Sequence, residues 1–309
     1  MKTVVIDGVT GMIGLAIIDA CISHGVDTIY AIIRKNSVNA KRLPKHPSIQ
    51  IIECNIDSYS ELPKLIDKKC DVFYHMAWTV TGRDRNLDIP GQESNIAYTL
   101  SALRAAKELG CEKFVGAGSQ AEYGILDVDK INPESPVNPI QAYGIAKYAA
   151  GKLGAAYAKQ LKIDFMWVRI FSIFGENDQS TTMIASSIKK MCNGEHTSFT
   201  HGEQRWDYLY SKDAGEAFYA IGLRSTGNKV YCLGSGNARK LKDMIITMRN
   251  IIDPNIELGI GEIPYKGDEV MNICADISAI ERDTGWKPKT SFEDGIRTIV
   301  SKYRKTMGK

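Results

Sequence analysis

Three tyrosines in this sequence stand four residues before a lysine. The pairs are Tyr143 with Lys147, Tyr148 with Lys152, and Tyr208 with Lys212. Residues four apart share one face of an α-helix, whereas Tyr148 projects about 140° away from Tyr143, so at most one of these two overlapping pairs can face a cleft. Tyr143 follows the loop NPIQA and begins its predicted helix, where a phenol reaches the edge of a sheet. We therefore select Tyr143 and Lys147.

The selected pair suits the reduction of a ketone. Hydride transfer to a carbonyl leaves an alkoxide that must gain a proton, and a phenol with a pKa of about 10 is a weak donor at neutral pH. A nearby ammonium stabilises the phenolate, so we expect Lys147 to lower the pKa of Tyr143. Ser119 ends the predicted strand KFVGAGS and can orient the carbonyl. Any one of these residues alone is typical of a solvated or capping side chain.

A glycine-rich loop, GVTGMIG, lies directly between a predicted strand, KTVVID, and a predicted helix. Its glycines permit a tight turn and let the backbone approach a pyrophosphate, whose charge then lies at the helix N-terminus. The alternative is a tight turn with no ligand. The residues assigned to cofactor binding here are Gly8, Gly11, Met12, Ile13 and Gly14.

The end of the second predicted strand, TIYAII, indicates which dinucleotide binds. NAD sites place an acidic residue there for the ribose 2′-hydroxyl, and NADP sites use arginine for the 2′-phosphate. This strand ends in Arg34, Lys35 and Ser37, whereas Asp27 lies at its opposite end. The sequence favours NADP over NAD. After the third strand, Asn55 and Ile56 are placed to border the adenine.

The order of elements predicts an α/β fold with a doubly wound parallel Rossmann sheet. Short β-branched runs alternate with amphipathic helices through the first half of the chain, which is typical of successive β-α-β units. We expect a dinucleotide-binding domain over residues 1–175, with residues 207–236 returning to it. Residues 176–309 are richer in turns and predict a smaller, mixed substrate lobe.

Composition excludes several classes of function. The 39 basic and 36 acidic residues are spread along 309 positions without a basic run, so no nucleic-acid partner is expected. Seven scattered cysteines without C-x-x-C spacing suggest neither disulfides nor a zinc cluster. No stretch reaches the roughly 18 apolar residues of a membrane span, and we expect a cytoplasmic protein.

These motifs together resemble the extended short-chain dehydrogenase/reductase family, in its nucleotide-sugar branch. The resemblance covers nearly the whole chain and includes GVTGMIG, CDVFYHMAW, ESNIAYTLSALRAA, GSQAEYG, YGIAK, VRIFSIFGEND, GEQRWDYLYSKDAG, VYCLGSG, GDEV and DTGWKP. It implies a triad of Ser119, Tyr143 and Lys147, with NAD(P) at the glycine loop and also beside Met76, Ala77 and Asn95. It further implies a nucleoside-diphosphate sugar in the C-terminal lobe and a homodimer formed through paired helices.

Departures from the family pattern narrow the reaction. Family dehydratases carry an Asp-Glu pair after a threonine, but this chain reads Ser119, Gln120, Ala121, Glu122, so dehydration is disfavoured and Glu122 is left without its acidic partner. The arginine that many members carry directly before Asp-Tyr is replaced by tryptophan and shifted one place earlier. The residues we assign to substrate binding are Trp78, Thr79, Gln120, Ser172, Arg205 and Trp206.

The tail of the chain resembles synthases that reduce 4-keto deoxysugar nucleotides. We therefore expect NADPH-dependent reduction of a nucleoside-diphosphate 4-keto-6-deoxysugar. Two alternatives remain open: an NAD-dependent nucleotide-sugar epimerase, and a non-catalytic NADP-sensing protein that keeps only the glycine loop.

Overall fold

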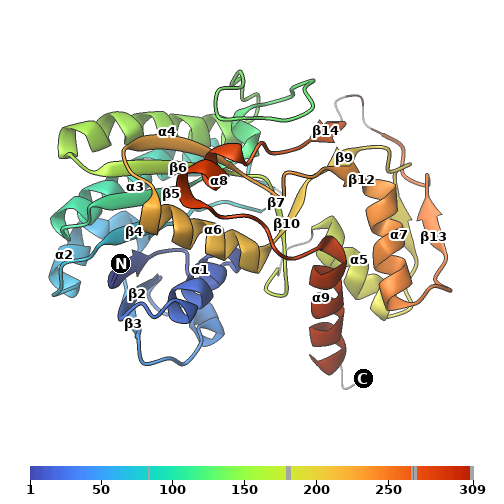
Figure 1. Ribbon diagram of the computed structural model, residues 1–309, viewed down its shortest axis with the longest axis horizontal. Coiled ribbons are helices and arrows are strands. Elements are labelled where there is room, and N and C mark those ends of the chain that lie inside the picture. Colours follow the sequence, from blue (N-terminus) through green and yellow to red (C-terminus); the bar gives the residue numbers. More distant parts are fainter. Residues whose placement is uncertain (83, 179–181, 266, 268–269, 307–309) are drawn as a thin grey trace.

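The computed structural model contains a seven-stranded parallel sheet with the order β11-β6-β5-β4-β1-β2-β3. It describes residues 1–306 except 83, 179–181, 266 and 268–269. Strand order reverses beside β1, which runs next to both β2 and β4. The predicted doubly wound Rossmann sheet is confirmed, and Figure 1 shows the smaller C-terminal elements gathered at one end of it.

The main sheet uses every strand that the sequence predicts in the first 171 residues, plus one that comes later. Its members are β1 (Thr3–Ile6), β2 (Thr28–Ile33), β3 (Ile49–Glu53), β4 (Val72–His75), β5 (Lys113–Ser119), β6 (Asp164–Ile170) and β11 (Asn228–Leu233). The helices beside it are α1 (Met12–Ser23), α2 (Leu62–Leu65), α3 (Ile89–Glu108), α4 (Ala142–Leu161), α6 (Ser211–Arg224) and α8 (Ser278–Thr284).

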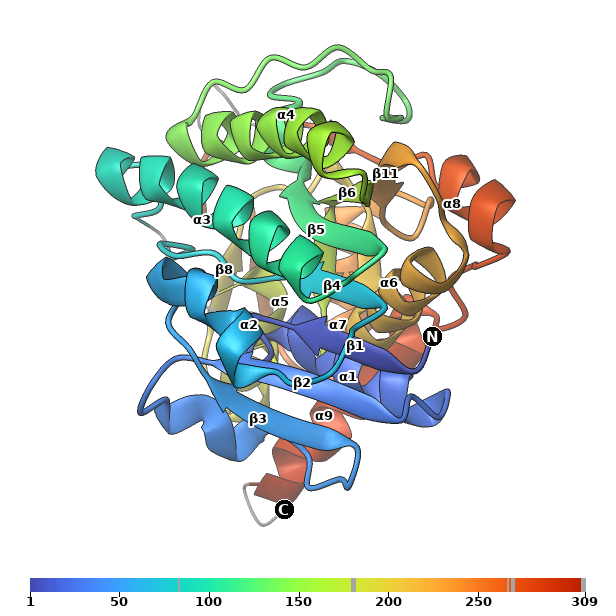
Figure 2. The ribbon, with the colours of Figure 1, turned by 90° about the vertical axis from the view of Figure 1, so that its left-hand side faces the viewer.

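Helices cover both faces of the sheet because its strands are apolar on both sides. Successive side chains of a strand point to opposite faces, and β1 illustrates this: Val4 and Ile6 belong to one core and Val5 to another. The first core contains α1 and α6, and the second contains α3 and α4. Figure 2 shows α3 and α4 side by side over one face.

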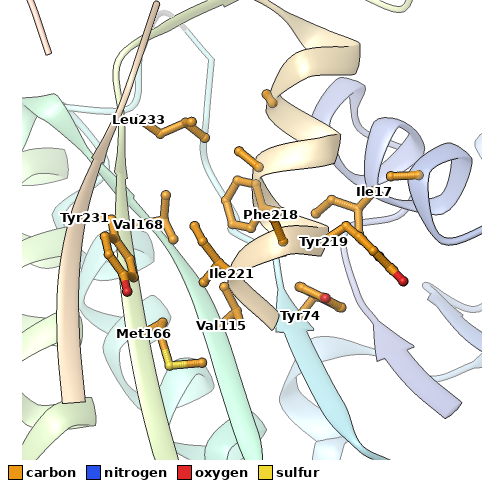
Figure 3. Packing of buried hydrophobic residues seen from close by; sticks show 14 of the residues in the cluster. Ile17, Tyr74, Val115, Met166, Val168, Phe218, Tyr219, Ile221, Tyr231 and Leu233 are labelled. Carbon is orange, nitrogen blue, oxygen red and sulfur yellow. The ribbon is translucent and has the colours of Figure 1, made fainter. Parts of the chain in front are cut away.

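Helix α6 supplies large apolar side chains to the first core. Phe218 and Ile221 are fully buried and belong to the same cluster as Val115, Val168 and Leu233 of the sheet. Figure 3 shows these side chains packed between the helix and the strands. Each such burial contributes about 1.5–3 kcal/mol, which holds residues far apart in sequence in one layer.

Helix α4 lies close to the sheet because two of its residues have no side chain. A Cβ on Gly151 would lie 2.6 Å from the indole nitrogen of Trp167, and one on Gly154 would lie 2.7 Å from the ring of Phe165. Real Cβ atoms do not approach other atoms this closely. The small residues thus fix the distance between α4 and β6.

The C-terminal elements have an apolar core of their own. It contains the buried residues Ile188 of α5, Met248 of α7 and Ile296 of α9. These elements are α5 (Met183–Cys192), β8 (Thr197–Phe199), β9 (Arg205–Trp206), β12 (Arg239–Lys240), α7 (Leu241–Ile252), β13 (Leu258–Ile260), β14 (Asn272–Ile273) and α9 (Phe292–Thr306). A further pair, β7 (Ser172–Phe174) and β10 (Tyr208–Tyr210), lies between them and the main sheet. The domain boundary at residue 175 stays a prediction.

The structure describes most of the chain, and membrane-spanning helices and the GDEV motif can be considered within that part. None of its helices is both long enough and apolar enough to cross a membrane. The two central residues of the GDEV motif, at positions 268 and 269, lie outside it.

Candidate active site

The glycine loop joins β1 to α1 and allows no side chain at two of its positions. Gly8 has a φ of +58°, and a Cβ there would lie 2.6 Å from the carbonyl carbon of Met76. A Cβ on Gly14 would lie 2.5 Å from the carbonyl oxygen of Gly8. Helix α1 begins after Gly11, which provides no side-chain cap for the first amide groups. This arrangement fits the pyrophosphate of a dinucleotide.

A cavity of about 470 Å³ adjoins this loop. Gly8, Gly11, Met76 and Ala77 line its glycine-loop side. Arg34, Ser37 and Ile56 line its far side, and no acidic residue is among the described residues of its wall. Met12, Gly14, Lys35 and Asn55 are outside the lining, and the Asn55 side chain accepts a hydrogen bond from the Lys35 amide at 3.1 Å.

The buried carboxylate of Asp7, which follows β1, hydrogen-bonds the backbone that follows β4. The Asp7 side chain is fully buried and accepts hydrogen bonds from the amides of Met76 at 2.5 Å and Ala77 at 2.7 Å. Its other oxygen lies 2.5 Å from Nδ1 of His75, whose Nε2 lies 3.2 Å from the Thr99 hydroxyl. Sequence analysis did not identify this pair, because Asp7 and His75 are 68 residues apart.

Asn95 holds the loop after β4 instead of lining a cavity. Its side chain is buried, accepts from the Thr79 amide at 2.9 Å and donates to the carbonyl of Thr79 at 3.0 Å. Thr79 itself lines the 470 Å³ cavity, which makes the predicted substrate residue a neighbour of the glycine loop. Contact of Asn95 with the cofactor stays a prediction.

A second cavity of about 540 Å³ opens at the carboxyl ends of β5 and β6. Three of its wall residues, Met76, Trp78 and Thr81, also line the first cavity. The predicted site residues in its wall are Ile13, Met76, Trp78, Ser119, Gln120, Tyr143, Lys147, Ser172 and Trp206. The fold therefore brings together side chains from the N-terminal, middle and C-terminal parts of the sequence.

Tyr143 is the second residue of α4, and the loop after β4 holds this end of the helix. The side-chain oxygen of Asn86 accepts a hydrogen bond from the Tyr143 amide at 3.2 Å. The guanidinium of Arg85 lies 4.6 Å from the centre of the Tyr143 ring. Arg85 lines the cavity but has no motif that would have identified it.

The pKa of Tyr143 moves in the direction opposite to our expectation. Burial raises its pKa above the ordinary value, while a hydrogen bond with Ser119 and the charge of Arg85 oppose the rise. Lys147 does not offset the burial, because its ammonium lies 5.9 Å from the Tyr143 ring centre and donates elsewhere. The predicted lowering of the Tyr143 pKa by Lys147 is therefore wrong.

Lys147 is almost completely buried, with 4% of its surface exposed. Its ammonium donates to the carbonyl of Ala117 at 2.6 Å and lies 3.5 Å from the centre of the Trp78 ring. Burial lowers the pKa of Lys147 to about 7, although the negative charges of Glu122 and Asp7 oppose this shift. The amine is therefore poised to titrate near neutral pH.

The other two Tyr-Lys pairs do not line this cavity as pairs. Tyr148 and Lys152 border a separate cavity of about 110 Å³ on the other side of α4. Tyr208 lines the 540 Å³ cavity, but Lys212 is directed to Glu176, 3.6 Å away. Tyr143 with Lys147 is the pair that shares this wall with Ser119.

The Glu122 carboxylate is surrounded by buried hydrogen-bond donors. Its carboxylate is fully buried and accepts hydrogen bonds from the Ser119 amide at 2.9 Å, Trp167 Nε1 at 2.9 Å and Arg169 Nε at 2.7 Å. It also completes a capping box with Ser119. From the sequence, Glu122 lacks the acidic partner that family dehydratases carry; in the structure its charged partner is the basic residue Arg169, 47 residues away on β6.

The substrate residues predicted in the C-terminal half separate into two groups. Trp206 Nε1 donates to the Ser172 hydroxyl at 2.7 Å, so these two form one part of the 540 Å³ wall. Arg205 is exposed, lies outside that wall and donates to the carbonyl of Ala238 at 2.8 Å. Its contact with substrate stays a prediction.

Comparison with known proteins agrees with this geometry. The model of the NAD dependent epimerase/dehydratase family matches residues 4–234. The chain belongs to this family. A dinucleotide-dependent enzyme is the class that the family, the glycine loop and the adjoining cavity define together.

Three similar proteins illustrate the range of the family. A putative UDP-glucose 4-epimerase of Methanocaldococcus jannaschii is 25% identical over 96% of this chain and 97% of its own. CDP-abequose synthase of Salmonella muenchen is 22% identical over 97% of each chain. The structure of RMD from Pseudomonas aeruginosa complexed with NADPH has a TM-score of 0.82 and 19% identity, over 99% of this chain and 100% of that one. This last likeness concerns the fold.

Proposed function

We propose that the protein is an NADPH-dependent reductase that converts a nucleoside-diphosphate 4-keto-6-deoxysugar to the 4-hydroxy sugar nucleotide. The observation that carries this proposal is the shared wall of Ser119, Tyr143 and Lys147 in a cavity that meets the glycine-loop cavity. A carbonyl held there has a hydroxyl, a phenol and an amine around it. These groups can hydrogen-bond the carbonyl oxygen and donate a proton to the alkoxide that forms from it.

Each side chain has a role that its surroundings support. A nicotinamide dinucleotide held by the glycine loop would supply the hydride. Ser119 orients the carbonyl oxygen through its hydroxyl, and Tyr143 gives its proton to the developing alkoxide. Because burial raises the pKa of Tyr143, the phenol stays protonated at neutral pH, while the Ser119 hydrogen bond and the Arg85 charge, which act to lower this pKa, favour release of the proton to the developing alkoxide. Lys147, whose ammonium lies 5.9 Å from the Tyr143 ring centre, holds the nicotinamide ribose in this proposal.

The absence of carboxylates from the wall argues against dehydration. Expelling a sugar hydroxyl needs a general acid, and the described residues lining the 540 Å³ cavity include no Asp or Glu. Glu122, the nearest acid in the motif, is held by Arg169. Arg85 and Lys147 give the wall a positive charge that suits an anionic sugar nucleotide.

NADPH is proposed as the cofactor because Arg34 and Ser37 line the 470 Å³ cavity where the adenosine half of the dinucleotide would bind. Arg34 and Ser37 offer a cation and a hydroxyl for a 2′-phosphate there, and a carboxylate that would repel this phosphate is missing from the described wall. The NADPH complex of RMD and the name of CDP-abequose synthase support a reductase of nucleotide deoxysugars.

We further propose a homodimer that pairs through α4, because the apolar side chains of Ile145 and Leu153 on this helix are each 50% exposed.

The decisive experiment incubates the enzyme with NADPH and a panel of keto-sugar nucleotides, followed by mass spectrometry. We expect consumption of NADPH and a gain of two hydrogens in one sugar nucleotide. Tyr143→Phe should abolish turnover, whereas Tyr148→Phe, one helical turn further on and outside the cavity, should retain it. Substantial turnover by Tyr143→Phe would refute the assigned roles.

An epimerase that retains NAD⁺ is the second candidate, favoured by the similarity to the protein of Methanocaldococcus jannaschii that is named a putative UDP-glucose 4-epimerase. The cofactor that copurifies with the protein separates the two functions. Bound NAD⁺, interconversion of two sugar nucleotides and no use of added NADPH would establish the epimerase. Bound or readily exchanged NADPH with net reduction would establish the reductase.

A further inference from the structure

The two cavities meet at Met76, Trp78 and Thr81, which belong to both walls. A dinucleotide that rests its pyrophosphate on Gly8 and reaches Tyr143 with its nicotinamide must extend past these residues. Trp78 is the largest of the three, so its position decides whether the two halves communicate.

The Trp78 ring rests against the active-site amine. The ammonium of Lys147 lies 3.5 Å from the ring centre, within the range of a strong cation–π contact. The same ring meets Tyr143 edge-on, with 6.3 Å between centroids and an interplanar angle of 81°. One indole therefore contacts both residues that the proposed chemistry requires.

One buried amide holds this indole and the loop that follows it. Gln92 accepts a hydrogen bond from Trp78 Nε1 at 2.9 Å and donates to the carbonyls of Val80 and Arg85, each at 2.9 Å. Val80 has a φ of +56°, a left-handed conformation that a β-branched residue rarely adopts. The loop thus has one residue in a disfavoured backbone conformation beside these side-chain contacts.

We propose that Trp78 is an aromatic gate between the cofactor cavity and the catalytic cavity. In the structure its ring covers the Lys147 ammonium and lines both cavities. Binding of the nicotinamide half of a dinucleotide moves the ring away and exposes the amine to the catalytic cavity. This inference rests on the dinucleotide site of the proposed function, but it holds for NADP and NAD alike because both carry the same nicotinamide half.

Tryptophan emission tests the gate without an activity measurement. The protein is titrated with NADP⁺, with NAD⁺, and with 2′,5′-ADP, which fills the adenosine end and lacks the nicotinamide. We expect an emission change with a full dinucleotide and none when 2′,5′-ADP binds, with binding itself followed by calorimetry. Trp78→Phe should lose most of the change, whereas Trp206→Phe, which removes the other tryptophan of the 540 Å³ wall, and Trp286→Phe, which lies outside both cavities, should retain most of it.

Association kinetics give a second measurement. Trp78→Leu removes the ring that must leave, so its association rate constant for the dinucleotide should exceed that of the parent by about two- to thirtyfold, the range of one cation–π contact. An unchanged rate together with a retained emission change in Trp78→Phe would overturn the gate. An equal emission change with 2′,5′-ADP would do the same.

The outcome for the gate is separable from the outcome for the reductase. Dinucleotide binding with the expected emission change, but without reduction of any keto-sugar nucleotide, would support the gate and contradict the reductase. Failure of both dinucleotides to bind would overturn the two together.

Discussion

Replacing Lys147 with methionine should make the protein more stable while abolishing turnover. The amine is buried, and its pKa falls from 10.5 to about 7. Each pKa unit corresponds to about 1.4 kcal/mol, so the shift represents a cost of up to about 5 kcal/mol at and below pH 7. The hydrogen bond to Ala117 and the Trp78 contact return about 2 kcal/mol, and both are lost in the variant. We expect a net gain of about 2–3 kcal/mol.

The gain should depend on pH in a defined direction. The unfolded chain keeps the proton on Lys147 up to pH 10.5, whereas the folded protein releases it near pH 7. The stability contributed by this site in the parent therefore rises between these values, by about 1.4 kcal/mol per pH unit, and the advantage of Lys147→Met disappears by about pH 9.

Chemical denaturation at several pH values measures this difference. Lys152→Met is the matched control, because Lys152 is exposed on the same helix and its replacement should leave stability within about 0.5 kcal/mol. The reasoning is refuted if Lys147→Met is less stable than the parent at pH 7, or if its advantage is independent of pH.

Three further predictions concern the ion pair, the glycine loop and the cofactor. Glu122→Gln leaves the Arg169 guanidinium buried without its anion and should lower the free energy of unfolding by about 3–5 kcal/mol in denaturation experiments. The double variant Glu122→Gln with Arg169→Met should recover at least half of that lost stability. A double variant as unstable as the single one would contradict the pairing. Gly8→Ala should abolish dinucleotide binding in calorimetry, while Gly25→Ala, which also has positive φ but nothing within 4 Å, should bind normally. Arg34→Ala should weaken NADPH binding about 10- to 150-fold and leave NADH unchanged, and equal losses for both would reject the 2′-phosphate contact.

The fold was predictable because its signals are local. Each strand of the sheet is a short apolar run between turn residues, and Gly25 and Gly110 follow α1 and α3 with φ values of +70° and +75°, as helix ends require. The glycine loop carries its structural context in neighbouring residues. Such features depend on fewer than about 30 consecutive positions.

The electrostatics of the site were not predictable, because they depend on contacts between distant segments. The i, i+4 spacing of Tyr143 and Lys147 indicates a shared helix face, but it does not reveal that Trp78 and the Ala117 carbonyl hold the amine. Likewise, no residue near Glu122 in the sequence predicts its ion pair with Arg169. The direction of a pKa shift follows from such partners and from burial, which arise only in the folded chain.

The missing side chains of Gly151 and Gly154 have a consequence for mutagenesis. They let α4 settle against the aromatic rings of β6, and α4 is the helix that carries the phenol and the amine at its beginning. A methyl group added at Gly151 would push helix α4 away from the sheet. The Tyr143 phenol and the Lys147 amine would then shift relative to Ser119, which stays on β5. Random screens for lost turnover should therefore recover alanine at this position, and a map of impaired variants would extend about one helical turn beyond Lys147, the last residue of α4 in the cavity wall.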